Sequence, residues 1–316
     1  MRYAINLGAN LDIKDGDKNT LLHYAAASGN MEIIFLIVGS MKDAGIDVRN
    51  WLRETPLHYA VMNGHTDVAR KLIELGANPY VVSNRKETLL HFAAQSGDIE
   101  MIQLALNLLQ DQNIDIVNEY SETPLHQAIQ GGHIEAVRML IELKADINRV
   151  AWNSNTSSLH FAAKSGSVEM IRLVFGLMEN RNIDMQDGCG RTALHYAAIC
   201  GKASAIRELI KLGADINKVS LWKETLLHCA AKSADKETIE VVIRMDFDVN
   251  ARDINDNAPL HCLLKANGCN VELVKLFISK GADVGAANSQ CETPLGIALV
   301  LGKVDIAKVL IDNLDN

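Results

Sequence analysis

The stretch TPLHYAVMNGHTDVARKLIELGANPY, which runs from Thr55 to Tyr80, decides how this 316-residue chain folds. It opens with threonine and proline, a pair that suits the N-cap and the first turn of a helix. Apolar residues follow at helical spacing, and Gly64 and Gly76 stand where two helices can end. The stretch therefore predicts two short helices followed by an extended hairpin.

Closely related stretches recur along the whole chain. They start near residues 20, 55, 88, 123, 157, 192, 225, 258 and 293, and a partial unit covers residues 1–19. Successive starts lie 33 to 35 residues apart, a period that indicates stacked repeats. We therefore expect a single repeat domain over residues 1–316, instead of the two or three globular domains that the length alone suggests.

These stretches resemble the ankyrin repeat, whose pattern contains T-P-L-H-x-A-A, then G-H, then G-A-D-x-N. The segment TALHYAAICGKASAIRELIKLGADINKV, from Thr192 to Val219, shows the same pattern, and the resemblance covers about residues 4–314. It implies an all-α solenoid of stacked helix-turn-helix units with β-hairpin fingers. It also implies a protein–protein interaction module that acts as an adaptor, scaffold or inhibitor, is not an enzyme, and holds no cofactor or metal.

The histidines follow the repeat. Eight of the ten stand in the L-H pair, and the other two, His65 and His133, follow a glycine between the two helices. The resemblance implies that the eight L-H imidazoles hydrogen-bond to neighbouring backbone turns. His228 lies next to Cys229, but the equivalent histidines are followed by Tyr, Phe, Gln or Cys, with no constant thiol. We therefore interpret His228 as structural and not as half of a catalytic pair. The eight are His23, His58, His91, His126, His160, His195, His228 and His261.

Ten of the fifteen aromatic residues fall at two kinds of repeat position. One position directly follows the L-H histidine; it points away from the buried stripe and, by the resemblance, faces a concave groove. The other lies in the fingers. Because Trp, Tyr and Arg carry much of the energy of interfaces, we predict a partner-binding groove lined by these aromatics and by two finger arginines. The predicted residues are Tyr24, Tyr59, Phe92, Phe161 and Tyr196, then Trp51, Tyr80, Tyr120, Trp152 and Trp222, with Arg53 and Arg85.

An alternative explains the same aromatics by packing. In this alternative they pack finger against finger and stiffen the stack of repeats. A second pattern also needs explanation: repeats one, three and five carry four extra residues between the L-H histidine and the predicted end of the second helix. Four residues make about one helical turn, so the second helices are expected to alternate in length.

Composition limits the partners. The formal net charge of −8 disfavours a nucleic-acid partner, which calls for a basic face. No apolar run reaches the length of a membrane span, and the first residues lack the apolar core of a secretory signal. All six cysteines lie in the C-terminal half without a C-x-x-C pair, which is typical of reduced thiols in the cytoplasm. We expect a monomer with a protein partner.

A second functional hypothesis belongs to a different class. The chain would be the targeting part of a larger enzyme, or of a secreted bacterial effector that meets its partner in the host cytosol. The catalytic domain would then lie outside this chain. The first unit, which has no helix resembling the L-H helix before it, favours this hypothesis.

Overall fold

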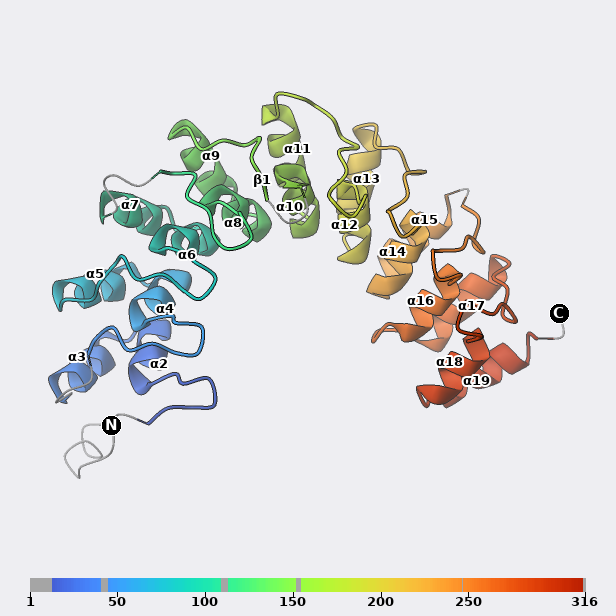
Figure 1. Ribbon diagram of the computed structural model, residues 1–316, viewed down its shortest axis with the longest axis horizontal. Helices are drawn as coiled ribbons and strands as arrows, with labels where there is room; N and C mark the ends of the chain where they lie inside the picture. The colour runs from blue at the N-terminus through green and yellow to red at the C-terminus, as the bar shows by residue number, and fades with distance from the viewer. Residues whose placement is uncertain (1–12, 41–44, 109–112, 152–154, 246, 315–316) are drawn as a thin grey trace. The chain divides into compact units, whose positions relative to one another are not determined.

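Pairs of antiparallel helices make up the fold (Figure 1). The computed structural model describes residues 13–40, 45–108, 113–151, 155–245 and 247–314, and these form two compact units, Met1–Asn153 and Ser154–Asn316. In each pair an outer helix follows an inner helix, and every inner helix except the last, which has Gly296 at that position, carries the L-H histidine. The all-α helix-turn-helix fold is as predicted, while the grouping of all repeats into one domain stays a prediction.

The first unit holds four described helix pairs. Its inner helices are α2 (Leu21–Ala27), α4 (Pro56–Met62), α6 (Leu89–Ser96) and α8 (Pro124–Gly131). Its outer helices are α3 (Met31–Ser40), α5 (Thr66–Glu74), α7 (Ile99–Leu108) and α9 (Ile134–Glu142), followed by the short strand β1 (Val150–Ala151).

The second unit begins with the short strand β2 (Thr156–Ser157) and holds five described pairs. Its inner helices are α10 (Ser158–Ser165), α12 (Ala193–Ile199), α14 (Leu226–Ser233), α16 (Pro259–Lys265) and α18 (Pro294–Val300). Its outer helices are α11 (Val168–Leu177), α13 (Ala203–Lys211), α15 (Lys236–Ile243), α17 (Val271–Ser279) and α19 (Val304–Ile311).

Small side chains let the inner helices of each unit stack closely. In α2, Leu22, Ala25 and Ala26 are buried, as their spacing predicts. Each inner helix contacts the next one in its unit, as α14 does with α16. Burying a leucine contributes about 2 kcal/mol, and alanine adds little area but allows the backbones to approach. The core is therefore a continuous aliphatic layer between neighbouring repeats.

The L-H histidine caps its own helix. At α8, the Thr123 N–H donates to Nδ1 of His126 (3.1 Å), and the His126 N–H donates back to Oγ1 of Thr123 (3.4 Å). This is a capping box in which histidine takes the place of the usual Glu or Gln. The nine residues that cap the inner helices are the nine predicted repeat starts.

The same imidazole ties one repeat to the next. Since Nδ1 accepts a hydrogen bond, the ring is neutral and carries its proton on Nε2. Nε2 of His126 donates to the Arg149 carbonyl (3.1 Å), and Nε2 of His228 to the Asn257 carbonyl (3.0 Å). The predicted bridge to a neighbouring turn is confirmed at His23, His58, His91, His126, His160, His228 and His261.

The two remaining histidines reach backward along the stack. Nε2 of His133 lies 2.9 Å from the Gln95 carbonyl, and Nε2 of His65 lies 2.9 Å from the Ala27 carbonyl. Each ring rests on a glycine of the preceding repeat, and Gly97 beneath His133 has a left-handed backbone (φ +73°). A side chain at this glycine would occupy the space of the imidazole.

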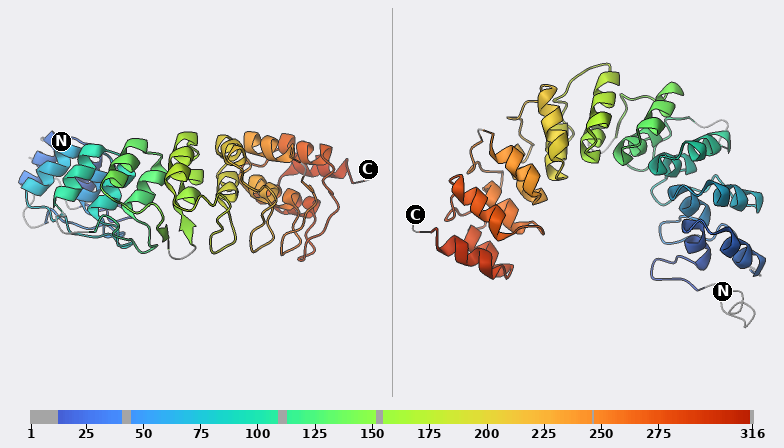
Figure 2. Two further views of the ribbon diagram at one scale, coloured as in Figure 1. Left: turned by 90° about the horizontal axis from the view of Figure 1, so that it is seen from above. Right: turned by 180° about the vertical axis from the view of Figure 1, so that it is seen from behind.

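The fingers project from one end of the helix pairs in each unit (Figure 2). Their tips are tight turns with one residue in the left-handed region, such as Arg53 (φ 58°) and Lys223 (φ 56°). Adjacent tips are linked by a backbone hydrogen bond: Trp51 N–H donates to the Asp17 carbonyl, and Ile254 N–H to the Trp222 carbonyl, each at 2.9 Å. The fingers of a unit therefore hold one another in register.

The predicted extra turn in alternate outer helices is wrong in the fifth repeat. There α11 ends at Leu177, and Met178 is extended (φ −65°, ψ 132°). The Met178 side chain is buried, so the chain turns into the core instead of continuing the helix. In repeats one and three the additional residues, 41–44 and 109–112, lie outside the described residues.

Candidate protein-binding face

The position after the L-H histidine does not form an exposed aromatic row. Phe92 and Phe161 are 2% and 5% exposed, so the prediction that they face a groove is wrong. The ring of Phe92 packs against the imidazole of His58 in the preceding repeat, with ring centroids 4.8 Å apart. A phenyl ring has no polar tip to keep in water, and it fills the gap between inner helices.

The tyrosines at this position are held by the fingers. Tyr59 packs edge-on against His23 and donates through its hydroxyl to Oδ1 of Asn19 (2.9 Å). The Tyr196 hydroxyl donates to Asp187 (2.9 Å), and burial together with that carboxylate raises the pKa of Tyr196 to about 12. Both are half-buried, while Tyr24 is exposed and bonds to Asp15. At this position Tyr24 alone offers a largely open ring.

Four finger aromatics are exposed among the described residues, and three of them lie beside a cation of the preceding finger. Lys18 lies 4.2 Å above the Trp51 ring, and the Trp51 indole also donates to the Gly16 carbonyl (3.1 Å). The corresponding pairs are Arg85 with Tyr120 at 5.9 Å and Arg191 with Trp222 at 4.7 Å. These contacts support the packing alternative, since each ring joins two fingers, yet the rings keep a face toward solvent.

The remaining predicted residues lie elsewhere. The Tyr80 hydroxyl donates to the Leu108 carbonyl (3.1 Å), which places this ring against the end of the outer helix α7. Arg53 and Arg85 are exposed at fingertips. Trp152 lies outside the described residues. Phe92 and Phe161 are therefore excluded from the predicted surface by their burial, and a single groove lined by the other residues stays a prediction.

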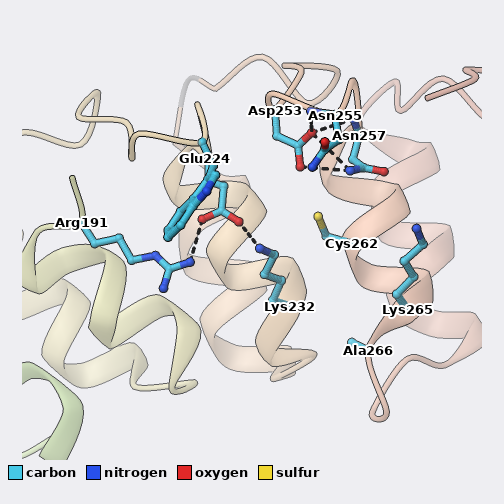
Figure 3. A pocket seen from close by; sticks show the side chains of 10 residues that line it. Arg191, Glu224, Lys232, Asp253, Asn255, Asn257, Cys262, Lys265 and Ala266 are labelled. Carbon is cyan, nitrogen blue, oxygen red and sulfur yellow. Dashed lines mark hydrogen bonds and ion pairs between the residues drawn. The ribbon is translucent and has the colours of Figure 1, made fainter. Parts of the chain in front are cut away.

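A cavity of about 470 Å³ lies in the second unit, in the corner between fingers and inner helices (Figure 3). One wall comes from the fingers and carries Trp222, Glu224 and Asp253. The other comes from α14 and α16. The full lining is Arg191, Trp222, Glu224, Lys232, Asp253, Asn255, Asn257, Cys262, Lys265 and Ala266.

An ion-pair network crosses the finger side of the cavity. Arg191 lies 3.0 Å from one oxygen of Glu224, and the Lys232 ammonium contacts the other oxygen. Burial raises the pKa of Glu224, but the hydrogen bonds from Lys232 and Arg191 outweigh it and bring the pKa below its usual value. Glu224 is thus a charged carboxylate that fixes one cation from the repeat before its own and one from the repeat after it.

The finger that carries Asp253 is organised around a turn. Asp253 accepts from the backbone N–H groups of Asn255 (2.8 Å) and Asn257 (2.9 Å) and from the Asn257 side chain. Lys265 pairs with Glu292 at 2.7 Å. The carboxylates of this corner therefore shape the fingers, and neither Glu224 nor Asp253 is placed as a free acid or base.

The cysteines near the cavity are held as thiols. Cys229 is fully buried, and burial raises its pKa to about 12. Burial likewise raises the pKa of Cys262, on the cavity wall, to about 11. Because the thiolate is the reactive species, neither is an activated nucleophile near pH 7. His228 beside Cys229 bonds to Thr225 and Asn257 instead, as a structural histidine.

Sequence reasoning found Trp222 but missed the charged residues around it. Glu224, Lys232 and Lys265 follow the repeat: an acidic residue often precedes the cap threonine, and the lysines stand seven residues after the cap. Each pattern by itself is typical of a solvated surface. Comparing these two positions would have brought out the corner, because Glu224 and Lys232 meet there in an ion pair.

Comparison with known proteins identifies the repeat. A family described as "Ankyrin repeats (3 copies)" matches residues 1–83, 75–151, 159–253 and 227–316, which is nearly the whole chain. The chain belongs to the ankyrin repeat family. Ankyrin repeats are protein–protein interaction modules, and this chain is such a module.

Several animal proteins are similar in sequence to part of this ankyrin chain. The B-cell lymphoma 3 protein homolog of Mus musculus is 33% identical over 205 residues, which are 64% of this chain and 45% of the mouse protein. Inversin of Danio rerio is 35% identical over 65 residues, 21% of this chain and 6% of that protein. The transient receptor potential channel pyrexia of Drosophila melanogaster is 38% identical over 81 residues, 26% and 8% respectively. The ankyrin chain thus spans less than half the length of these relatives.

Among the described residues, no helix combines the length and the apolar character needed to cross a bilayer.

Proposed function

We propose that this ankyrin chain binds a protein partner through the corner of the second unit that holds the cavity, and that it does so without catalysing a reaction. The observation that carries the proposal is the 470 Å³ cavity with an exposed tryptophan, Trp222, at its edge. Next to it Leu221 and Ile254 are exposed at adjacent fingertips. Exposed apolar groups around a recess, rimmed by charges, favour a docking surface over a solvated one.

The chemistry of the corner supports a binding role. The carboxylates Glu224 and Asp253 are occupied by intramolecular hydrogen bonds, and the nearby thiols are protonated near pH 7. What remains for a partner is an aromatic ring, apolar fingertips and ammonium groups. This set suits an adaptor, scaffold or inhibitor.

In the first unit, Trp51 and Tyr120 offer a second, smaller contact surface at the fingertips. Both rings are already paired with a cation of the preceding finger, so they present flat, rigid faces that lose little freedom on binding. We assign the main anchor to Trp222, since only this finger aromatic borders the described cavity.

The other hypothesis from the sequence uses the same corner. As the targeting part of a larger enzyme or of a secreted bacterial effector, the chain would still recruit its partner through Trp222. The six free cysteines fit an encounter in the cytoplasm, with the chain as a monomer.

Replacing Trp222 with alanine is expected to weaken partner binding at least tenfold, because a central tryptophan is a frequent interface anchor. Affinity capture from eukaryotic cell extract, followed by mass spectrometry and a titration of the captured protein, measures this. Leu177→Ala is the matched control, since Leu177 and Trp222 are both 39% exposed but Leu177 lies at the end of the outer helix α11. Equal affinity of the Trp222 variant and the parent would contradict the proposal, provided that both keep their helical circular dichroism.

A further inference from the structure

The cavity offers more hydrogen-bond donors than acceptors. Glu224 is 5% exposed at its side chain, and its two oxygens are taken by Lys232 and Arg191. Both oxygens of Asp253 accept hydrogen bonds from its own finger. Each carboxylate oxygen of the wall therefore already has at least one donor inside the protein.

The lysines of the wall have donors to spare. The Lys232 ammonium makes one ion pair, to Glu224, and the Lys265 ammonium makes one, to Glu292, among the described residues. Each ammonium has three N–H donors. Their side chains are 38% and 45% exposed, and both line the cavity. Two ammonium groups with unused N–H donors thus face one recess from neighbouring inner helices, α14 and α16 (Figure 3).

The residues that line the cavity also carry a net positive charge, which favours a negatively charged acceptor as the spare donors do. Three cations, Arg191, Lys232 and Lys265, face two carboxylates, Glu224 and Asp253, which leaves one positive charge. The chain as a whole carries a formal net charge of −8. Glu292, the partner of Lys265, lies outside the lining and offsets this charge. The unused N–H donors of the two ammonium groups favour an acidic group in the recess, while the negative charge of the rest of the chain disfavours one elsewhere, so the recess sets the orientation of an acidic partner.

Apolar groups complete the recess. Trp222, Cys262 and Ala266 line it between the charged residues. They can contact the methylene groups of a side chain whose carboxylate reaches the lysines. This arrangement of an apolar wall and cationic end groups is complementary to glutamate or aspartate.

We propose that the cavity binds an acidic side chain, Glu or Asp, of a partner protein segment, with the ammonium groups of Lys232 and Lys265 as its donors. This inference rests on the proposed function and names the chemistry of the partner at that site. Arg191 holds Glu224 in place and stacks on Trp222, so it positions the aromatic wall.

The test begins with peptides selected on the purified full chain from a library of random 12-residue peptides. Peptides that lose affinity for the Trp222→Ala variant are kept as probes of this corner. We expect these probes to share an Asp or Glu whose replacement by Asn or Gln lowers affinity about tenfold. A lower affinity at high salt should accompany this preference.

A charge swap makes the test specific. Lys265→Glu is expected to weaken the acidic probes about tenfold, and a probe with Lys in place of its acidic residue should regain affinity for this variant. Lys308→Glu is the matched control, because it makes the same charge change on the exposed face of the outer helix α19. Thermal unfolding of each variant confirms that it is folded.

The outcomes separate the two proposals. Probes that bind at Trp222 but show no acidic preference, or no response to Lys265→Glu beyond that to Lys308→Glu, overturn the acidic assignment and leave the docking corner standing. A selection in which no peptide depends on Trp222 contradicts both.

Discussion

Lowering the pH from 7 to 5 is expected to cost the first unit about 2 kcal/mol of folding free energy for each of His58, His91 and His126. Burial, against which the backbone hydrogen bond at Nε2 acts only in part, lowers the pKa of all three from 6.5 to about 4. Because the folded form disfavours the added proton, the unfolded chain binds more protons between pH 6.5 and 4. Stability is therefore complete above pH 6.5 and falls as the pH drops toward 4.

The hydrogen bond at Nδ1 gives a second reason, besides burial, for this loss of stability. A proton on Nδ1 removes the acceptor for the cap N–H, which is 2.9 Å from His58 and 3.1 Å from His126. Urea unfolding at pH 7, 6 and 5, with NMR titration of the imidazole carbons, measures the effect. An unfolding midpoint that is constant over this range, or imidazoles that titrate near 6.5 in the folded protein, would contradict it.

His126→Gln provides the control. Glutamine at this capping-box position keeps an acceptor for the Thr123 N–H but does not titrate. The variant is expected to be somewhat less stable at pH 7, because the bond to the Arg149 carbonyl depends on the imidazole. Between pH 7 and pH 5 the variant should lose about 2 kcal/mol less folding free energy than the parent, because one titrating histidine is absent.

Gly97→Ala is expected to destabilise the first unit by about 3–6 kcal/mol. A methyl group at residue 97 would lie 2.3 Å from the His133 ring, so the ring must move and lose its bond to the Gln95 carbonyl. Overpacking costs about 1–3 kcal/mol, the left-handed backbone about 1–2, and the lost hydrogen bond about 1. Chemical denaturation of the purified variant measures the sum.

Gly132→Ala is a closely matched control for Gly97→Ala. Gly132 also ends an eight-residue inner helix in the left-handed region, at φ +77°, but no atom lies within 4 Å of its added methyl group. It should lose only the backbone part, about 1–2 kcal/mol. In the double variant Gly97→Ala, His133→Ala the collision disappears, so part of the stability should return. Equal losses for the two glycine variants would show that the His133 contact has no effect.

Most of the fold could be predicted from residues that lie close together in the sequence. The cap residues, the L-H histidines and the buried Leu22, Ala25 and Ala26 act over one helical turn, so their spacing in the sequence is enough to place them. The prediction of an extra turn in the fifth repeat was wrong because it depends on residues far away in the sequence. Whether Met178 continues a helix depends on the core that receives its side chain, and that core comes from other parts of the chain.

The candidate site likewise has features that could be predicted from the sequence and features that could not. An aromatic at a finger position, such as Trp222, could be predicted because a fingertip faces solvent in every repeat. The burial of Phe92 could not, since it depends on the imidazole of His58, 34 residues earlier. Nor could the joining of Arg191, Glu224 and Lys232, which are contributed by three successive repeats.

The sequence by itself determined the repeat, its helix pairs, its caps and the structural role of its histidines, because all of these rest on contacts a few residues apart or on a pattern repeated nine times. Only the tertiary structure decided which aromatics are buried and where the cavity with its lysines lies. Those features depend on the side chains that neighbouring repeats place against each other. These side chains differ from one repeat to the next, even though the repeated backbone is nearly the same.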